Sequence, residues 1–243
     1  MDYSFLQCGD GALTVHLGDG IDPAINRRGT ALQGAIGSAG LRGITDLIPA
    51  YADLTVCYDC TVISAKALQR QLRRLLDSLS VAGQDRRRVF RLPVCYGGDY
   101  GPDLDFVCHH SGLSAQEVIA LHSAPDYLIY MLGFLPGFAY LGGLDPRLHT
   151  PRLDSPRTCI PAGSVGIGGA QTGVYPLASP GGWQLLGRTP VSVFDRQRQE
   201  PILYRAGDLV HFVPISPAEY EEIARAVAAG AYTVQVEEVS VCD

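Results

Sequence analysis

Residues 133 to 190 constrain the fold more than any other part of the chain, because they are rich in glycine and proline and yet aromatic. They hold 12 of the 28 glycines, 8 of the 16 prolines and the only tryptophan. Low-complexity linkers are repeats of Gly, Ser or Pro, whereas here each Gly or Pro stands beside Phe, Tyr, Trp, Leu or Ile. We therefore predict ordered loops with demanding backbone angles, not a linker.

The segment starts with GFLPGFAYLGGL, residues 133 to 144, which contains no charged residue. Glycine costs about 0.5 to 1 kcal/mol inside a helix or strand, and proline breaks both. A loop this apolar does not simply face water. We expect a rigid loop whose aromatic side chains are covered.

Composition excludes several classes of protein. The 243 residues are 47% hydrophobic, enough for one large domain or two modest ones. The net charge of -6 and the lack of a basic cluster beyond Arg86 to Arg88 argue against a nucleic-acid partner. No basic leader precedes an apolar run, and no segment has the roughly 18 apolar residues of a membrane span, so we expect a cytoplasmic protein without membrane contact.

The seven cysteines show no framework spacing, and their odd number disfavours complete pairing, so we expect reduced thiols. Cys57 and Cys60 form a CxxC at the end of an apparent strand. No second pair completes a zinc site, and we interpret both as structural. No metal site is predicted.

Periodicity predicts two units separated by the polar segment GQDRRR, residues 83 to 88. The first, residues 1–86, is a small α+β domain. Gly40 closes its first helix, and Ser64 caps a second whose leucines share one stripe. Its predicted helices start at residues 23 and 64, and its predicted strands are 12–17, 44–51 and 54–59.

The second unit, residues 87–243, begins with a strand at 88–98 and contains two capping-box motifs, at Ser114 to Glu117 and Ser216 to Glu219. The latter opens a C-terminal helix that ends on Gly230. Short strands at these spacings are typical of an all-β barrel or sandwich; they are predicted at 126–133, 189–195, 201–204 and 208–215.

Ile160 to Gly173, IPAGSVGIGGAQTG, resembles three known loops and matches none. GxGxxG between a strand and a helix is missing, and so is the Lys of a P-loop. Ala162 stands where a nucleophile elbow needs Gly, which disfavours Ser164 as a nucleophile. Two interpretations remain open. Bunched glycines can form a nest of backbone N–H groups, here Gly163 to Gly169, for an anion, or they can form a closely packed hairpin.

Any anion held by side chains in this region needs arginine, because the chain's one lysine is Lys66. Arg157 and Arg188 are the best candidates, since each lies in a loop constrained by Pro and Gly. Each can instead form a surface ion pair, with Asp145, Asp154 or Asp195 as the available partners. The other arginines of the region are Arg147 and Arg152.

The histidines and the acidic turn match no standard site. His109, His110 and His122 lack metal-ligand spacing, and we expect a place near a helix start or simple exposure. His16 and His211 lie in apparent strands and are predicted to be structural. The acidic GGDYGPDLD, residues 97–105, lacks the register of an EF-hand.

These segments resemble the family of 5-oxoprolinase B-subunits, also called the KipI or allophanate hydrolase subunit 1 family. The resemblance is essentially full length. The segments that carry it are GGDYGPDLD (97–105), GFLPGFAYLGGLD (133–145), TPRLDSPRTCIPAGSVGIGG (150–169) and QTGVYPLASPGGWQLLGRTP (171–190), with GDGALTVHLGDGID (9–22) and RAGDLVHFVPIS (205–216).

The resemblance implies a small N-terminal α/β domain followed by a cyclophilin-like β-barrel. It also implies one component of an enzyme that opens the lactam of 5-oxoproline to L-glutamate with ATP and Mg²⁺, together with a related C-subunit and an A-subunit of 5-oxoprolinase. An unstrained amide is a poor electrophile, and phosphorylating its oxygen makes it a good one. Positioning and charge stabilisation then do most of the work.

We assign anion contacts to Arg157 and Arg188. The expected substrate-binding or partner-facing residues are Phe134, Pro136, Gly137, Phe138, Tyr140, Gly163, Ser164, Val165, Gly166, Gln171, Tyr175 and Trp183. Two other branches stay open: a component of an allophanate hydrolase or urea carboxylase, and a binding module that inhibits a sensor histidine kinase. Prolyl isomerase activity is disfavoured, because fold alone does not carry function.

Overall fold

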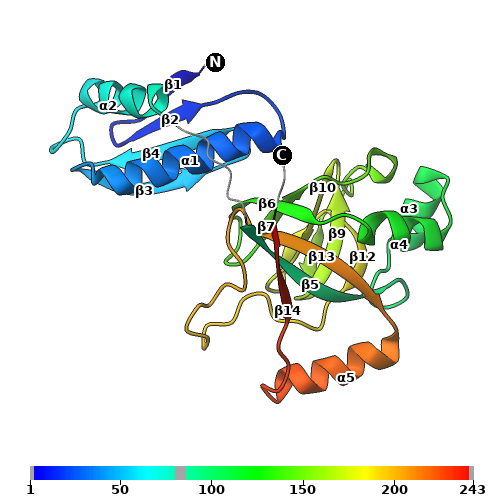
Figure 1. Cartoon of the computed structure of the whole chain (residues 1–243). Helices are drawn as coiled ribbons and strands as arrows, with labels where there is room; N and C mark the ends of the chain where they lie inside the picture. Colours follow the sequence, from blue (N-terminus) through cyan, green and yellow to red (C-terminus); the bar gives the residue numbers. More distant parts are fainter. Residues whose placement is uncertain (1–2, 80–85, 241–243) are drawn as a thin grey trace. The chain divides into compact units, whose positions relative to one another are not determined.

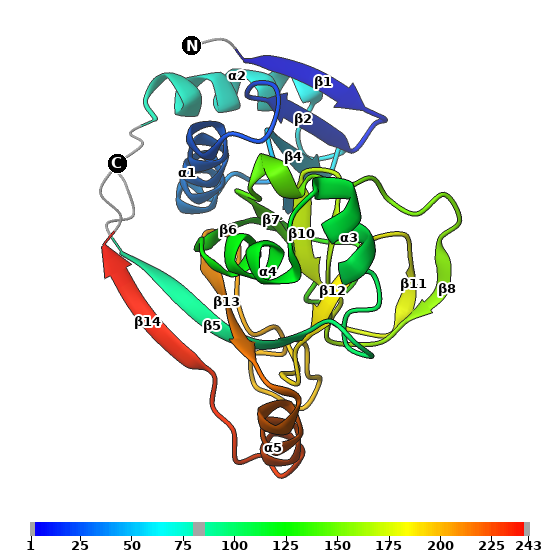
Figure 2. The same ribbon diagram turned by 90° about the vertical axis from the view of Figure 1, so that its right-hand side faces the viewer.

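The computed structural model describes residues 3–79 and 86–240. The chain divides into two compact units, one ending at residue 85 and the other beginning at Arg86 (Figures 1 and 2). Residues 83–85 of the polar segment expected at the boundary lie outside the described residues. Each unit has its own apolar core.

The first unit combines one antiparallel sheet with two helices. Sequence chemistry sets its helix ends: Asp22 caps the first helix, Gly40 ends it in the left-handed conformation, and Ser64 caps the second. The strands are β1 (Ser4–Cys8), β2 (Ala12–His16), β3 (Ile44–Pro49) and β4 (Asp53–Tyr58), in the order β1-β2-β4-β3, and the helices are α1 (Pro23–Ala39) and α2 (Ala65–Asp77).

The core of this unit follows from two periodicities. Leu13 and Val15 alternate on β2, so both face the same side of the sheet. Leu68, Leu72 and Leu76 recur at every fourth position of α2, as the sequence pattern predicted, and all are buried. The helices therefore cover one face of the sheet with apolar side chains.

The second unit contains a closed barrel of seven strands. The sheet runs β12-β9-β10-β7-β6-β13-β5, and β12 pairs again with β5 to close it. The barrel strands are β5 (Arg86–Tyr96), β6 (Tyr127–Leu132), β7 (Ala139–Gly142), β9 (Ser164–Gly168), β10 (Gln171–Val174), β12 (Gln184–Arg188) and β13 (Leu209–Ile215). The fold expectation of a barrel is confirmed.

Helices and a two-stranded ribbon surround the barrel (Figure 2). Both predicted capping boxes form, with Ser114 and Glu117 opening one helix and Ser216 and Glu219 another. The helices are α3 (Leu104–Ser111), α4 (Ala115–Ser123) and α5 (Pro217–Ala228), with a short 3-10 helix, η1 (Pro146–Leu148), and the ribbon pairs β8 (Arg157–Ile160) with β11 (Ser179–Gly181).

The acidic loop 97–103 closes the barrel. The Gly97 N–H donates to Leu186 O, and the Asp103 N–H donates to Leu185 O. The Asp103 carboxylate in turn accepts the Leu185 N–H at 2.7 Å. A Cβ at Gly101 would collide with the backbone of Leu186, so only glycine lets the loop lie this close to β12. The expected turn is present, and its role is to seal the β12 to β5 seam.

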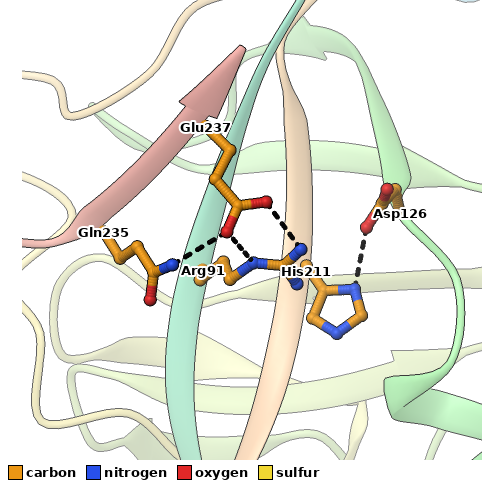
Figure 3. Close-up of polar contacts among 5 residues, drawn as sticks. All are labelled: Arg91, Asp126, His211, Gln235 and Glu237. Atoms are coloured by element: carbon orange, nitrogen blue, oxygen red, sulfur yellow. Dashed lines mark hydrogen bonds and ion pairs between the residues drawn. The ribbon is translucent and has the colours of Figure 1, made fainter. Parts of the chain in front are cut away.

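β14 (Gln235–Ser240) lies outside the closed barrel, paired antiparallel with β5. Arg91 on β5 grips Glu237 on β14 with two hydrogen bonds of 2.8 Å, and Gln235 donates to the same carboxylate (Figure 3). On the neighbouring β13, the His211 ring nitrogen Nδ1 lies 2.8 Å from the Asp126 carboxylate. Polar and ionisable side chains therefore link the strands on this outer face.

The structure corrects three local predictions. Residues 189–195 and 201–204 are not strands; they share one isolated bridge, between Phe194 and Ile202. Apolar and polar residues alternate in this loop because individual side chains, such as those of Val191 and Val193, pack into the barrel core. The α5 helix does not end the fold, because β14 follows it. β1, α3 and the strands inside residues 139–188 were not predicted as elements.

Candidate functional site

The glycines of β9 and β10 form a flat platform on the outside of the barrel. Val165 and Ile167 point into the barrel core, so the alternating Gly166 and Gly168 face outward. A Cβ on Gly168 would lie 2.6 Å from the Trp183 ring. The indole therefore lies directly against a backbone that carries no side chain at that point.

Gly173 on β10 extends this platform. A Cβ there would lie 3.2 Å from the Trp183 ring and 3.5 Å from the tip of Phe138. The combination of glycine with aromatic residues in the sequence thus has a packing reason. Glycines supply flat backbone, and aromatic rings cover it.

Phe138 is the centre of an aromatic cluster on this platform. Its ring makes edge-to-face contacts with four other rings, at centroid distances of 5.1 to 5.6 Å. This geometry is the one that aromatic quadrupoles favour. Phe138 itself is 2% exposed. The four partners are Phe134, Tyr140, Tyr175 and Trp183.

The aromatic cluster lines a surface cavity of about 380 Å³, which we call the aromatic pocket. This volume lies at the lower end of the range of roughly 300 to 1,000 Å³ for small-molecule sites. Its walls come from β7 and the loop before it, the loop before β8, the residue after β10, and the segment from β11 to β12. The lining residues are Phe134, Phe138, Tyr140, Arg152, Pro156, Tyr175, Pro180, Gly181, Gly182 and Trp183.

Phe134 stands at the rim under backbone strain. It is the one non-glycine residue with positive φ, at 65°, in the part of the chain that the structure describes. The left-handed conformation costs a non-glycine residue about 1 kcal/mol or more. Its side chain is also 64% exposed. Such outliers concentrate at functional sites, and here the strain holds an aromatic ring over the pocket.

The other side of the same loop borders a second cavity, of about 310 Å³. Pro136 and Gly137 line this second cavity and not the aromatic pocket. Gly137 has a φ of 82°, and its carbonyl accepts a hydrogen bond from the buried Tyr204 hydroxyl at 3.0 Å. The two residues thus shape the loop that presents Phe134.

Arg157 lies near the pocket but already has a partner. Its guanidinium donates to the Asp103 carboxylate at 2.7 Å and to Trp183 O at 3.4 Å. The Asp103 side chain is 11% exposed and the Arg157 side chain 30%, so the pair is partly shielded from water. Arg157 therefore ties the β8 strand to the loop that closes the barrel. Its expected role as an anion contact has no support in this geometry.

Arg188 lies in a different cluster, beneath α5. Its guanidinium carbon is 6.0 Å from the Tyr100 ring centre. The Tyr100 and Tyr220 rings lie 4.4 Å apart, and Tyr100 donates to Glu221 at 2.9 Å, which raises the Tyr100 pKa to about 12. Arg188 does not line the aromatic pocket. The two arginines predicted as a pair thus belong to different surroundings.

The segment Ile160 to Gly173 forms the hairpin of β9 and β10, one of the two interpretations left open. β9 pairs on both sides, with β10 and β12. Gly163 donates to Tyr175 O and Gly169 to Thr150 O, each at 2.7 Å. These amides are therefore committed within the fold, which favours the packed hairpin over the anion-binding nest.

The remaining predicted residues of this hairpin belong to the strands of the barrel and not to the pocket. Val165 belongs to the barrel core. Ser164 is completely buried, and its hydroxyl has no hydrogen-bond partner among the described residues, so no base activates it as a nucleophile. Gly166 packs against Gln184 O, and Gln171 starts β10. None of the four lines the aromatic pocket.

The histidines have structural surroundings. His122 is wholly buried, contrary to the expectation of exposure. Its ring nitrogens lie 2.8 Å from the Tyr96 and Thr172 hydroxyls, and burial lowers its pKa to about 3. His16 and His211 each bond an aspartate. Within residues 3–79 and 86–240, no group of three His, Cys, Asp or Glu side chains is placed to hold a metal ion.

Sequence reasoning thus located five pocket residues and missed five. It identified the aromatic side chains because they stood out in a Gly- and Pro-rich region. It missed Pro156, and it missed Pro180, Gly181 and Gly182, which directly precede Trp183; it also preferred other arginines to Arg152. A usable signal was present in part, since SPGGW places three of these residues directly before Trp183.

Comparison with known proteins places this chain in a family. The family described as carboxyltransferase domain, subdomain C and D, matches residues 3–204. The 5-oxoprolinase B-subunit of Bacillus subtilis is 42% identical over 228 residues, which cover 90% of this chain and 95% of that protein. No helix among the described residues has the length and apolar character needed to span a membrane.

Two solved structures extend the comparison. TTHA0988 is 41% identical with a TM-score of 0.74; the match covers 84% of this chain and 40% of the TTHA0988 chain. The urea amidolyase of K. lactis is 24% identical with a TM-score of 0.82, covering 97% of this chain and 16% of that one, which shows a shared fold. The chain therefore belongs to the family of 5-oxoprolinase B-subunits, within the carboxyltransferase domains of subdomain C and D type.

Proposed function

We propose that this protein is the B-subunit of an ATP-dependent 5-oxoprolinase, which opens the lactam ring of 5-oxoproline to L-glutamate. The observation that carries the proposal is its similarity to the Bacillus subtilis protein over 95% of that protein's length. The similarity to a urea amidolyase supports a shared fold at 24% identity, so lactam opening is the better supported activity.

The proposed architecture is an α+β domain, residues 1–86, followed by a cyclophilin-like barrel, residues 87–243. The four-stranded sheet with two helices supports the first assignment, and the closed barrel of seven strands supports the second. The boundary is supported by the division of the chain at Arg86.

We propose that the enzyme is completed by the 5-oxoprolinase C-subunit, bound tightly, and by the A-subunit, in the cytoplasm. The aromatic pocket supports this arrangement, because it is open at the surface and Phe134 at its rim is 64% exposed. A large exposed aromatic residue held in a strained conformation is typical of a surface that another molecule covers.

The aromatic pocket does not fit ATP. A triphosphate with Mg²⁺ needs several cations or backbone donors and an oxygen ligand for the metal, whereas the pocket is lined by one arginine and no carboxylate. We therefore assign the nucleotide to a different part of the assembly. This chain's contribution is to hold and desolvate the substrate.

The test combines the purified chain with the C-subunit and the A-subunit and measures glutamate formation from 5-oxoproline and ATP. We expect turnover by the assembly and none by the chain alone. Full activity of the isolated chain contradicts a shared site, and an inactive assembly contradicts the function.

The partner-facing role of Phe134 has its own test. We expect Phe134→Ala to weaken association with the C-subunit or to reduce turnover. Phe106→Ala is the matched control, because Phe106 is a 49% exposed aromatic residue on α3 that does not line the pocket. Equal behaviour of the two variants contradicts the role.

A further inference from the structure

Arg152 is the one charged side chain that lines the aromatic pocket. Its guanidinium carbon lies 5.9 Å from the centre of the Trp183 ring, a cation–π arrangement. Across the described residues, Arg152 forms no ion pair with a carboxylate. The neighbouring arginines differ, because Arg147 is bound by Asp145 and Arg157 by Asp103. Arg152 therefore keeps its hydrogen-bond donors available beside an apolar cavity.

The chemistry of the walls restricts what this guanidinium can bind. Aromatic rings and two prolines surround the cavity, and the lining contains no Asp, Glu or Lys. Arginine binds a carboxylate with two parallel hydrogen bonds, and a low-dielectric surrounding strengthens them. Flat aromatic walls favour a compact ring. One charge matches a singly charged ligand and not a polyphosphate.

We propose that the aromatic pocket binds a small cyclic monocarboxylate, with the carboxylate held by Arg152 and the ring against Trp183 and Phe138. In the proposed enzyme this ligand is 5-oxoproline, and that identification depends on the proposed function. Arg152 is then the residue that selects for the carboxylate, in place of Arg157 and Arg188.

The position of Arg152 over the indole suits this role. The guanidinium carbon lies 5.9 Å from the indole centre, within cation–π range, and the exposed side chain leaves its N–H donors accessible to a ligand. The platform of Gly168 and Gly173 in turn fixes the indole. The glycine backbone therefore positions the indole, and the indole attracts the Arg152 guanidinium to the side of the pocket.

The chain's single tryptophan makes binding directly observable. Trp183 fluorescence of the full chain is titrated with 5-oxoproline and with 2-pyrrolidinone, which has the same lactam ring without the carboxylate. We expect saturable binding of 5-oxoproline and at least a roughly 10-fold weaker response to 2-pyrrolidinone, since a charge-assisted hydrogen bond is lost. Equal affinity for the two compounds overturns the proposal.

The variant Arg152→Gln removes the charge from an exposed position and keeps a polar side chain of moderate length. We expect it to weaken 5-oxoproline binding about 10- to 100-fold while leaving 2-pyrrolidinone unaffected. Calorimetry supplies a second readout, because the substitution itself alters the Trp183 environment. Arg196→Gln is the control, since Arg196 is exposed, outside the pocket and without an ion pair in the described residues.

Kinetics of the assembled enzyme separate this inference from the proposed function. We expect Arg152→Gln to raise KM for 5-oxoproline by the same factor, and Arg196→Gln to leave it unchanged. Turnover by the assembly with an unchanged KM in Arg152→Gln overturns the pocket assignment and leaves the function standing. If the chain binds carboxylates selectively but the assembly does not open 5-oxoproline, the proposed function is overturned and the proposed site is kept.

Discussion

Two outer faces of the same barrel use opposite chemistry. On β9 and β10, three outward positions are the glycines Gly166, Gly168 and Gly173, and aromatic rings that line a cavity cover Gly168 and Gly173. On β5, β13 and β14, the outward side chains include the polar and ionisable Arg91, His211 and Glu237, and we call this the charged face (Figure 3). In strands, outward residues alternate with the core residues, so each face is free to vary while the interior is kept. The aromatic face carries the pocket for which ligand binding is proposed, and the charged face fastens an edge strand.

The largest expected difference between the faces concerns Phe138, which touches four rings and is 2% exposed. We expect Phe138→Ala to lower the free energy of unfolding of the barrel by about 3 to 5 kcal/mol, as deletion of a buried ring does. Urea denaturation followed by Trp183 fluorescence measures it. The control is Val236→Ala on β14, a 44% exposed apolar side chain outside the closed barrel, which should change it by less than about 0.5 kcal/mol. Similar losses in both variants would remove the contrast.

The platform itself is tested by Gly168→Ala. The added methyl group meets the Trp183 ring, so we expect a loss of about 1 to 3 kcal/mol in unfolding free energy and weaker ligand binding. Gly182→Ala serves as the control within the same pocket, because its Cβ would lie at an ordinary contact of 3.6 Å. Denaturation and fluorescence titration of both variants measure the effects. A tolerated Gly168→Ala means that the indole does not rest on the backbone as described.

Substitutions on the charged face should lower the unfolding free energy less than Phe138→Ala does, and their effect should depend on pH. Arg91→Ala removes a bidentate ion pair whose side chains are 29% and 38% exposed, and we expect a loss of about 0.5 to 1 kcal/mol. Arg91 lowers the pKa of Glu237 below its ordinary 4.5. The pair's stabilisation is therefore present above pH 4.5 and is lost as pH falls through the lowered pKa. Unfolding measured at pH 7 and at successively lower pH should show the variant and the parent converging.

Arg86→Ala is the matched control for that measurement. Arg86 lies on the same strand and approaches Glu238 on β14 at 3.6 Å, with side chains that are 78% and 65% exposed. Solvent screens such a pair, so no measurable change is expected. If Arg86→Ala lowers the unfolding free energy as much as Arg91→Ala does, the bidentate geometry of the Arg91–Glu237 pair is not the cause. Any positive charge on β5 would then stabilise its pairing with β14.

Only a small effect on stability is expected for Arg152→Gln. The guanidinium is exposed, and its contact with Trp183 contributes about 0.5 to 1 kcal/mol at most. Thermal denaturation should therefore give nearly the parental midpoint, even though ligand binding falls. A large drop in the midpoint would make Arg152 a structural residue and explain lost binding by unfolding.

Local chemistry made several elements predictable. Capping boxes at Ser114 and Ser216 and the left-handed Gly40 are properties of a few adjacent residues, and all three form as expected. The leucine stripe of α2 is also a local property, because residues four positions apart lie on the same face of a helix. The strands of the Gly-rich region were missed, since glycine has low strand propensity and their pairing joins residues far apart in sequence.

The sequence by itself determined the family, the two-part organisation expected of it, the capped helices and the aromatic character of residues 133 to 190. The tertiary structure decided which arginine serves the pocket. Arg152, Arg157 and Arg188 all lie among prolines and glycines, but Asp103 reaches Arg157 from 54 positions away and leaves Arg152 as the one charge beside the rings. Ion pairing depends on the distance between two side chains in space. The sequence does not show that distance when the two residues are far apart along the chain.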